Sequence, residues 1–332
     1  MNAASQKTAL VTGANSGLGF EAAALLAEAG WGKVILACRT KAKAEAARAR
    51  LVERTGKDTF DLLAVDTSEV ASANTACDQL READEKIDFL LLNAGATGTQ
   101  PQFNSDGVEI TWASTLVGHH VMTMRMLGDE LLSPGARIVI AGSEGSRGNF
   151  PGMKVHDIGK VANELFDGDR VAAIDALARI KGSYKFVSFN EYVTAKLVVA
   201  WWAAALSRRL PAGMTVNAVS PGSAPASNFA RNAPFMMRFF MLPMMKIIGP
   251  LMGMAGAIET AARRYLDAAE LTDDETGHFY ATAHRKKLVG PVGIQAWPAY
   301  FTDQVSQEAG FDAVVKLTGV RFPDSVGHNR TG

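Results

Sequence analysis

Tyr192 and Lys196 stand four residues apart at the start of a long apolar run that predicts a helix as far as Leu206. Residues at this spacing lie on one face of a helix, so the lysine ammonium can sit beside the tyrosine phenol. A phenol has a pKa of about 10 in water, and a neighbouring cation favours its charged form and lowers that value. The spacing therefore predicts an acid/base pair, although a solvated pair on a helix surface shows the same pattern.

A glycine-rich turn near the N-terminus predicts a nucleotide site. An apolar run at residues 7–11 leads into Thr12, and a helical pattern follows at residues 20–27. Between them, backbone N–H groups and the positive end of the helix can bind a pyrophosphate, which glycines allow to approach closely. The residues expected to form this site are Gly13, Asn15, Ser16, Gly17, Leu18 and Gly19. Tight packing alone can also require such glycines.

The next predicted strand, residues 33–38, leads directly into Arg39, and Lys43 follows closely. At this position a carboxylate binds the ribose 2′-hydroxyl of NAD, whereas an arginine accommodates the 2′-phosphate of NADP. No carboxylate stands there. We therefore expect NADP, with a plain surface charge as the alternative interpretation of Arg39.

Further apolar runs predict parallel strands at residues 60–65, 87–92, 136–141 and 214–219, and a seventh strand at residues 278–282. Helical stretches separate most of them, which is typical of a doubly wound α/β sheet with helices on both faces. Ligands bind at the carboxyl ends of such strands. The candidate residues at these ends are Asp66, Thr67, Asn93, Ala94, Gly95, Ser143, Pro221 and Gly222.

Taken in order, the glycine turn, Asn93-Ala94-Gly95, Ser143, the Tyr192/Lys196 pair and Pro221-Gly222 resemble the short-chain dehydrogenase/reductase family over roughly residues 7–285. Within that family they resemble the branch of retinol dehydrogenases and protochlorophyllide reductases. The resemblance implies a Rossmann-type sheet of about seven strands. It also implies that Tyr192 is the proton donor, that Lys196 holds the nicotinamide ribose, and that Ser143 binds the carbonyl oxygen.

Three positions depart from that pattern. Thr115 stands where the branch carries an Asn that supports a proton-relay water, and we expect its hydroxyl to hold a water instead. Ser223 replaces the cysteine that follows Pro-Gly in light-dependent protochlorophyllide reductases, which argues against a photochemical reaction. Glu144, next to Ser143, is unusual for the family.

Two segments look specific to this chain within a single domain spanning 1–332. Residues 147–190 form an insertion with a predicted helix at 171–180, which we expect to be a flap over the site. Residues 223–256 form an apolar segment; its part 234–254 holds seven of the thirteen methionines and is expected to contact a bulky apolar substrate or a membrane surface.

Composition restricts the remaining possibilities. The 332 residues carry 34 basic and 34 acidic side chains, a balance that argues against nucleic acid as partner. Two cysteines are too few for a disulfide framework, and the histidines lack ligand spacing, so we expect buried thiols and no metal. The chain lacks an apolar leader, which favours a cytoplasmic protein. The apolar helix beginning at Tyr192 is expected either to form a homodimer interface or to be covered by insertions of this chain.

These observations predict an NADP(H)-dependent oxidoreductase that interconverts an alcohol and a carbonyl on a bulky apolar molecule. Two alternatives remain open. One is a non-catalytic NADP-binding protein of the same fold, favoured by Thr115 and Glu144. The other is a reductase of carbon–carbon double bonds, as in the protochlorophyllide branch.

Overall fold

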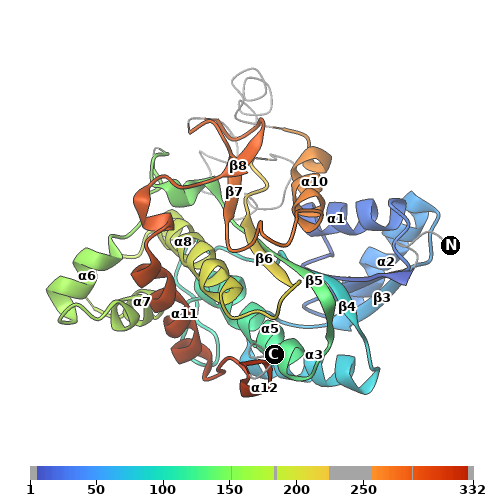
Figure 1. The fold of residues 1–332 in the computed structure, drawn as a ribbon, viewed down its shortest axis with the longest axis horizontal. Coiled ribbons are helices and arrows are strands. Elements are labelled where there is room, and N and C mark those ends of the chain that lie inside the picture. The colour runs from blue at the N-terminus through green and yellow to red at the C-terminus, as the bar shows by residue number, and fades with distance from the viewer. Residues whose placement is uncertain (1–5, 151, 183–184, 224–255, 286, 328–332) are drawn as a thin grey trace.

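A single eight-stranded sheet forms the centre of the computed structural model, which describes residues 6–150, 152–182, 185–223, 256–285 and 287–327. The strands lie in the order β3-β2-β1-β4-β5-β6-β7-β8 (Figure 1). Their bounds are β1 Thr8–Thr12, β2 Lys33–Cys38, β3 Phe60–Ala64, β4 Ile87–Leu92, β5 Leu132–Ala141, β6 Thr215–Val219, β7 Phe279–Thr282 and β8 Val292–Ile294. The predicted α/β class is confirmed.

The first seven strands pair in parallel, and β8 pairs antiparallel with β7 at the edge of the sheet. Strands β1, β2, β4 and β6 are buried almost throughout, as parallel strands covered on both faces must be. The eighth strand was not predicted. It is three residues long with two exposed apolar side chains, so it gives no continuous apolar run.

Helices cover both faces and form two separate apolar cores. One core lies under α1 (Gly17–Glu28), α2 (Lys41–Thr55) and α10 (Ile258–Ala269). The other lies under the helices on the opposite face (Figure 1). These are α3 Val70–Glu82, α4 Ile110–Trp112, the π-helical turn η2 Ala113–Val117, α5 Gly118–Gly128, α6 Ile158–Leu165, α7 Arg170–Ala178, α8 Ser188–Ser207 and α11 Gln304–Thr318. Short turns η3 (Glu144–Arg147), η6 (Ala299–Phe301) and α12 (Asp324–Gly327) complete the described elements.

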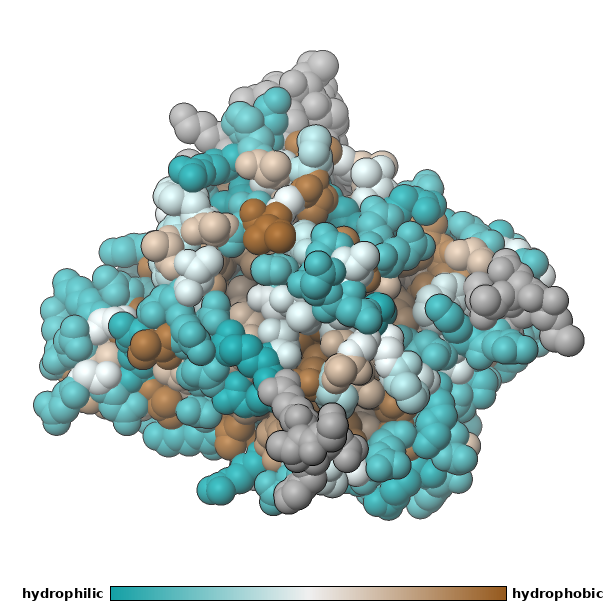
Figure 2. Space-filling view, in the orientation of Figure 1, coloured by the Kyte–Doolittle hydropathy of each residue, from teal (hydrophilic) through white to brown (hydrophobic). Residues whose placement is uncertain are grey.

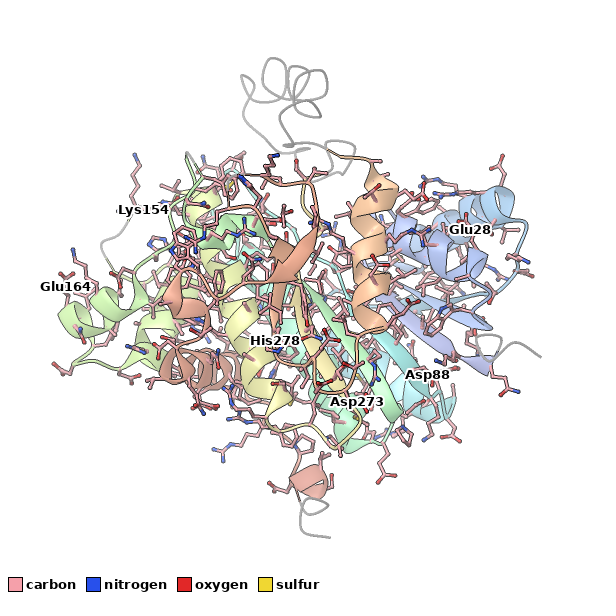
Figure 3. The ribbon with its side chains drawn as sticks, turned by 45° about the horizontal axis from the view of Figure 1, so that its top comes forward. Glu28, Asp88, Lys154, Glu164, Asp273 and His278 are labelled. Atoms are coloured by element: carbon pink, nitrogen blue, oxygen red, sulfur yellow. The ribbon has the colours of Figure 1, made fainter. Side chains whose placement is uncertain are left out.

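The insertion at 147–190 belongs to the body of the molecule. Its helix α7 buries Ile174 and Leu177 in the larger core, and the Glu109 N–H donates to the carbonyl of Ala178 at 2.8 Å. Lys154 and Glu164 lie at the periphery of this part, away from the sheet (Figure 3). None of the described residues of the insertion lines the cleft described below. Helix α7 is packed into the core, and a flap over the substrate side of the site stays a prediction.

The C-terminal helix α11 packs against α8. The Trp201 indole N–H donates to the Tyr300 carbonyl at 2.6 Å, and Gly310 of α11 lies against the Trp201 side chain. Near the end of α8, Arg208 and Arg209 both pair with Glu308, at 2.7 and 2.5 Å. Thus α11 occupies a face of α8, the helix for which we expected either a dimer partner or cover from the chain itself.

The surface in the view of Figure 1 is mostly hydrophilic, with hydrophobic residues scattered between (Figure 2). Within the described residues, no helix is both long and apolar enough to span a bilayer. The apolar segment 223–256 is described only at 223 and 256, so the predicted substrate or membrane contact of 234–254 lies outside the described residues.

Candidate active site

A cleft of about 410 Å³ opens beside the carboxyl ends of the central strands. Most residues predicted to form the site line this cleft. They are Gly13, Asn15, Ser16, Gly17, Leu18, Arg39, Lys43, Asp66, Thr67, Asn93, Ala94, Gly95, Tyr192, Lys196 and Pro221. Four predicted residues do not line it: Gly19, Thr115, Ser143 and Gly222.

The turn after β1 has a backbone conformation that requires glycine at three positions. Gly13 and Gly17 have φ of +68° and +59°, in the left-handed region that favours glycine. A Cβ on Gly19 would come within 2.6 Å of the Gly13 carbonyl oxygen. Gly19 therefore serves the site by letting α1 begin close behind the turn.

Thr12 joins this turn to the one after β4. Its hydroxyl accepts hydrogen bonds from the backbone N–H groups of Asn93 at 2.8 Å and Ala94 at 2.9 Å. The Asn93 side-chain amide donates to the Thr12 carbonyl at 3.0 Å. Two turns that are eighty residues apart in the chain thus form one wall of the cleft.

The cleft fits an anionic dinucleotide. Ser16 is the N-cap of α1, and its side chain makes no capping hydrogen bond. The backbone N–H groups in the first turn of α1 can therefore donate to a phosphate, whose negative charge this end of the helix favours. Arg39 and Lys43 both line the cleft, and neither forms an ion pair with a described carboxylate. Two cations without an acidic partner at this wall suit a phosphate group.

Asp66 and Thr67 are held by local hydrogen bonds. One carboxylate oxygen of Asp66 accepts from the Ser68 N–H at 3.0 Å and from its hydroxyl at 2.6 Å. The Thr67 carbonyl accepts from the Gly118 N–H at 2.8 Å. These bonds fix the part of the cleft wall that follows β3.

Ser143 follows β5 and is the N-cap of η3, where its hydroxyl oxygen accepts from the Gly145 N–H at 3.2 Å. The same side chain is hydrogen-bonded to Tyr192 in the first turn of α8. Tyr192 is partly exposed and lines the cleft. The structure therefore brings the predicted serine and tyrosine together.

Lys196 lies one turn further along α8, with its ammonium 5.8 Å from the centre of the Tyr192 ring. It donates a hydrogen bond to the Ala141 carbonyl at 2.6 Å. Burial lowers the pKa of Lys196 to about 7.

The predicted effect of Lys196 on the phenol is not seen. Burial raises the pKa of Tyr192 to about 12, the hydrogen bond from Ser143 opposes the rise, and the Glu144 carboxylate adds to it. Lys196 fails to offset the burial because its ammonium faces the Ala141 carbonyl and is itself destabilised by burial. The structure thus contradicts the expectation that Lys196 lowers the pKa of Tyr192.

Thr115 lies in the buried π-helical turn η2. Its carbonyl is within 2.9 Å of His119 Nδ1, and its hydroxyl oxygen would be 3.5 Å from a Cβ on Gly95. The residue is thus behind the Asn93-Ala94-Gly95 turn. Its role in holding a relay water stays a prediction.

Several residues that line the cleft were not predicted. They are Ala37, Val65, Ala96, Thr97, Ser114, Ala141, Gly142 and Tyr265. Most are neighbours of predicted residues at the same strand ends. Tyr265 comes from the middle of α10, and nothing in its local sequence distinguishes it from a core tyrosine.

Other titratable groups do not assemble a metal site. The described residues contain no group of three histidine, cysteine or acidic side chains able to hold a metal ion. Cys38 and Cys77 are buried free thiols, as predicted. Burial lowers the pKa of His119 to about 3 and that of His120 to about 4, so both are neutral at pH 7.

A parallel sheet in this order, with a glycine turn and a Ser–Tyr–Lys set at one edge, defines a dinucleotide-binding oxidoreductase fold. Comparison with known proteins agrees. Residues 7–167 match the family model described as short chain dehydrogenase. The chain belongs to the short-chain dehydrogenase/reductase family.

Individual relatives cover parts of the chain. It is 31% identical over 229 residues to the human WW domain-containing oxidoreductase, covering 68% of this chain and 51% of that protein. It is 36% identical over 140 residues to protochlorophyllide reductase A of Arabidopsis thaliana, covering 40% of this chain and 34% of the relative. The chain thus spans about half the length of the first relative and a third of the second.

A solved structure resembles nearly the whole fold. An uncharacterised protein from Mycobacterium paratuberculosis superposes with a TM-score of 0.68 at 22% identity, covering 96% of this chain and 95% of that chain. The likeness extends beyond the residues matched by the family model and includes the C-terminal part of the fold.

Proposed function

We propose that this protein is an NADP(H)-dependent oxidoreductase that interconverts a carbonyl and an alcohol on a bulky apolar molecule. The observation that carries the proposal is the hydrogen-bonded Ser143–Tyr192 pair, with Lys196 one turn away, beside a cleft that suits a dinucleotide. When bound, NADPH supplies a hydride. The residues of this chain would bind the cofactor, orient the substrate and donate the proton.

Arg39 and Lys43 would hold the 2′-phosphate, and the first turn of α1 would hold the pyrophosphate. Lys196, which lines the cleft next to Tyr192, would hold the nicotinamide ribose. No described carboxylate forms an ion pair with Arg39 or Lys43.

In carbonyl reduction, Tyr192 donates its phenolic proton to the substrate oxygen, and Ser143 hydrogen-bonds the same oxygen as negative charge develops on it. A donor placed in this way contributes about 2.7–4 kcal/mol. The raised pKa of Tyr192 keeps the phenol protonated at neutral pH, so it carries the proton that carbonyl reduction needs.

The test is a screen of NADPH oxidation over retinoids, steroids, quinones and aliphatic aldehydes with the parent protein and Tyr192→Phe. The variant should lose turnover by about 100-fold or more, since it lacks the general acid, while binding NADPH as before. Tyr280→Phe is the matched control, because the Tyr280 hydroxyl is buried with no hydrogen-bond partner among the described residues and does not line the cleft.

Binding of NADPH without turnover of any carbonyl by the parent would refute the proposal and favour a non-catalytic NADP-binding protein. Tyr192→Phe with parental activity would show that another group donates the proton. A second candidate, reduction of a carbon–carbon double bond, is favoured by the similarity to protochlorophyllide reductase. Turnover of a tetrapyrrole, but of no carbonyl, would support it.

A further inference from the structure

Glu144, the residue after Ser143, is buried and accepts four hydrogen bonds. Its Oε1 accepts from the Thr282 N–H and hydroxyl, each at 3.1 Å, and from Arg264 Nη1 at 3.3 Å. Its Oε2 accepts from the Ser220 hydroxyl. A buried carboxylate costs several kcal/mol unless it is paired and fully hydrogen-bonded, and here it is both.

Arg264 completes the set from α10. Besides Glu144, its Nη1 donates to the Ser220 carbonyl at 3.2 Å, and its Nη2 donates to the Thr282 hydroxyl and the Gly290 carbonyl, each at 3.1 Å. It is nearly as buried as Glu144. We call Glu144, Arg264, Ser220 and Thr282 the clamp.

Three members of the clamp are directly followed or preceded by a residue of the site. Ser143 precedes Glu144 and is hydrogen-bonded to Tyr192, while Pro221, after Ser220, lines the cleft. Tyr265, after Arg264, also lines the cleft. The clamp thus ties the ends of β5, β6 and β7 and the middle of α10 at one point behind the site.

We propose that Glu144 and Arg264 are positioning residues, whose buried ion pair holds Ser143 against Tyr192 and the Pro221 turn against the cleft. This inference deepens the function proposed above and rests on it. It also gives Glu144 a role in positioning the catalytic serine. From the sequence alone, the same residue favoured a non-catalytic protein.

The clamp has an electrostatic consequence besides the geometric one. The Glu144 carboxylate raises the pKa of Tyr192, after burial has done so. Removing its charge should therefore lower that pKa, whereas loss of Arg264 hydrogen bonds with retention of a cation should not. Charge and geometry can be separated on this basis.

The experiment compares Glu144→Gln, Arg264→Lys and the double variant Glu144→Gln/Arg264→Met, which removes both charges of the ion pair and serves if a single variant folds poorly. Two readouts are used. One is kcat and KM for NADPH with the best carbonyl substrate. The other is the ¹³C NMR titration of the Tyr192 ring, assigned with Tyr192→Phe and measured without any substrate.

For Glu144→Gln and the double variant we expect the Tyr192 titration to move down by about one pH unit, the low end for a nearby charge. For Arg264→Lys we expect no such movement. All three should lose about tenfold or more in kcat through misplacement of Ser143, with KM for NADPH little changed. Glu308→Gln, which breaks the partly exposed ion pairs with Arg208 and Arg209 at the far end of α8, is the control and should change neither readout.

An unchanged Tyr192 titration together with parental kcat in folded Glu144→Gln, or in the double variant, would overturn the proposal. A downward shift in Glu308→Gln as large as in Glu144→Gln would do the same, because the effect would then be general destabilisation. If the parent turns over no carbonyl, the proposed function fails, and the NMR titration still decides the electrostatic role of the clamp.

Discussion

Arg39→Ala is the sharpest test of cofactor choice. Arg39 lines the cleft and has no ion pair with a described carboxylate, so its removal breaks no structural bridge, and the whole effect should fall on binding. A hydrogen bond to a charged group contributes about 1.5–3 kcal/mol, which corresponds to about a 10- to 150-fold change in affinity. Because Arg39 is exposed, water and salt screen the interaction, and we expect the lower part, about 10- to 30-fold.

The assay is a fluorescence titration of NADPH and NADH with parent and variant at two salt concentrations. NADH lacks the 2′-phosphate, so its affinity should change little. The loss for NADPH should shrink at high salt, as screening weakens the parental contact. Lys43→Ala should act in the same direction.

Arg48→Ala is the matched control. Arg48 is on the same helix as Lys43, pairs with Asp58 at 2.7 Å and does not line the cleft. Equal weakening of NADPH and NADH by Arg39→Ala would refute the reasoning, since it would place the side chain away from the 2′-phosphate. Equal affinity of the parent for both cofactors would refute the choice of NADP altogether.

Two further predictions concern stability. Burial raises the pKa of Glu109 to about 7 from an ordinary 4.5, so its stabilising contribution is present below pH 4.5 and is lost as pH rises to 7; Glu109→Gln should therefore gain about 1–3 kcal/mol over the parent between pH 5 and pH 8. A pH-independent difference in denaturant unfolding would contradict this. Gly310→Val should destabilise by about 1–3 kcal/mol, because even a Cβ there would lie 3.0 Å from Trp201 Cβ, whereas Gly159→Ala, which meets only ordinary contacts, should not. Equal urea midpoints for these two variants would mean that α11 shifts to accommodate the larger side chain without loss of stability.

The sequence predicted those features that depend on the residues of one short segment alone. The apolar runs of the parallel strands are unbroken because both faces are covered, and the glycines of the first turn are required by backbone geometry within seven residues. The pairing of Ser143 with Tyr192 was implied by the resemblance to the short-chain dehydrogenase/reductase family. These parts of the site could be placed before the structure.

The rest depends on contacts between distant segments. Arg264 is 120 residues from Glu144, and no spacing rule relates them, so Glu144 could only be judged unusual. Tyr265 reaches the cleft because α10 packs beside α1. The pKa of Tyr192 was misjudged for the same reason: the neighbouring lysine is visible in the sequence, whereas burial is a property of the finished fold.

On the proposed mechanism, the C-terminal part of the chain contributes to the chemistry as well as to the fold. The family model matches residues 7–167 and stops before α8, which carries both Tyr192 and Lys196. The far end of α8 packs against α11, whose Gly310 lies against the Trp201 side chain. On the proposal that the clamp holds Ser143 separately, the distance between the Ser143 and Tyr192 hydroxyls depends on packing at both ends. We therefore expect Gly310→Val to slow proton transfer as well as to destabilise the fold, even though no residue of α11 lines the cleft.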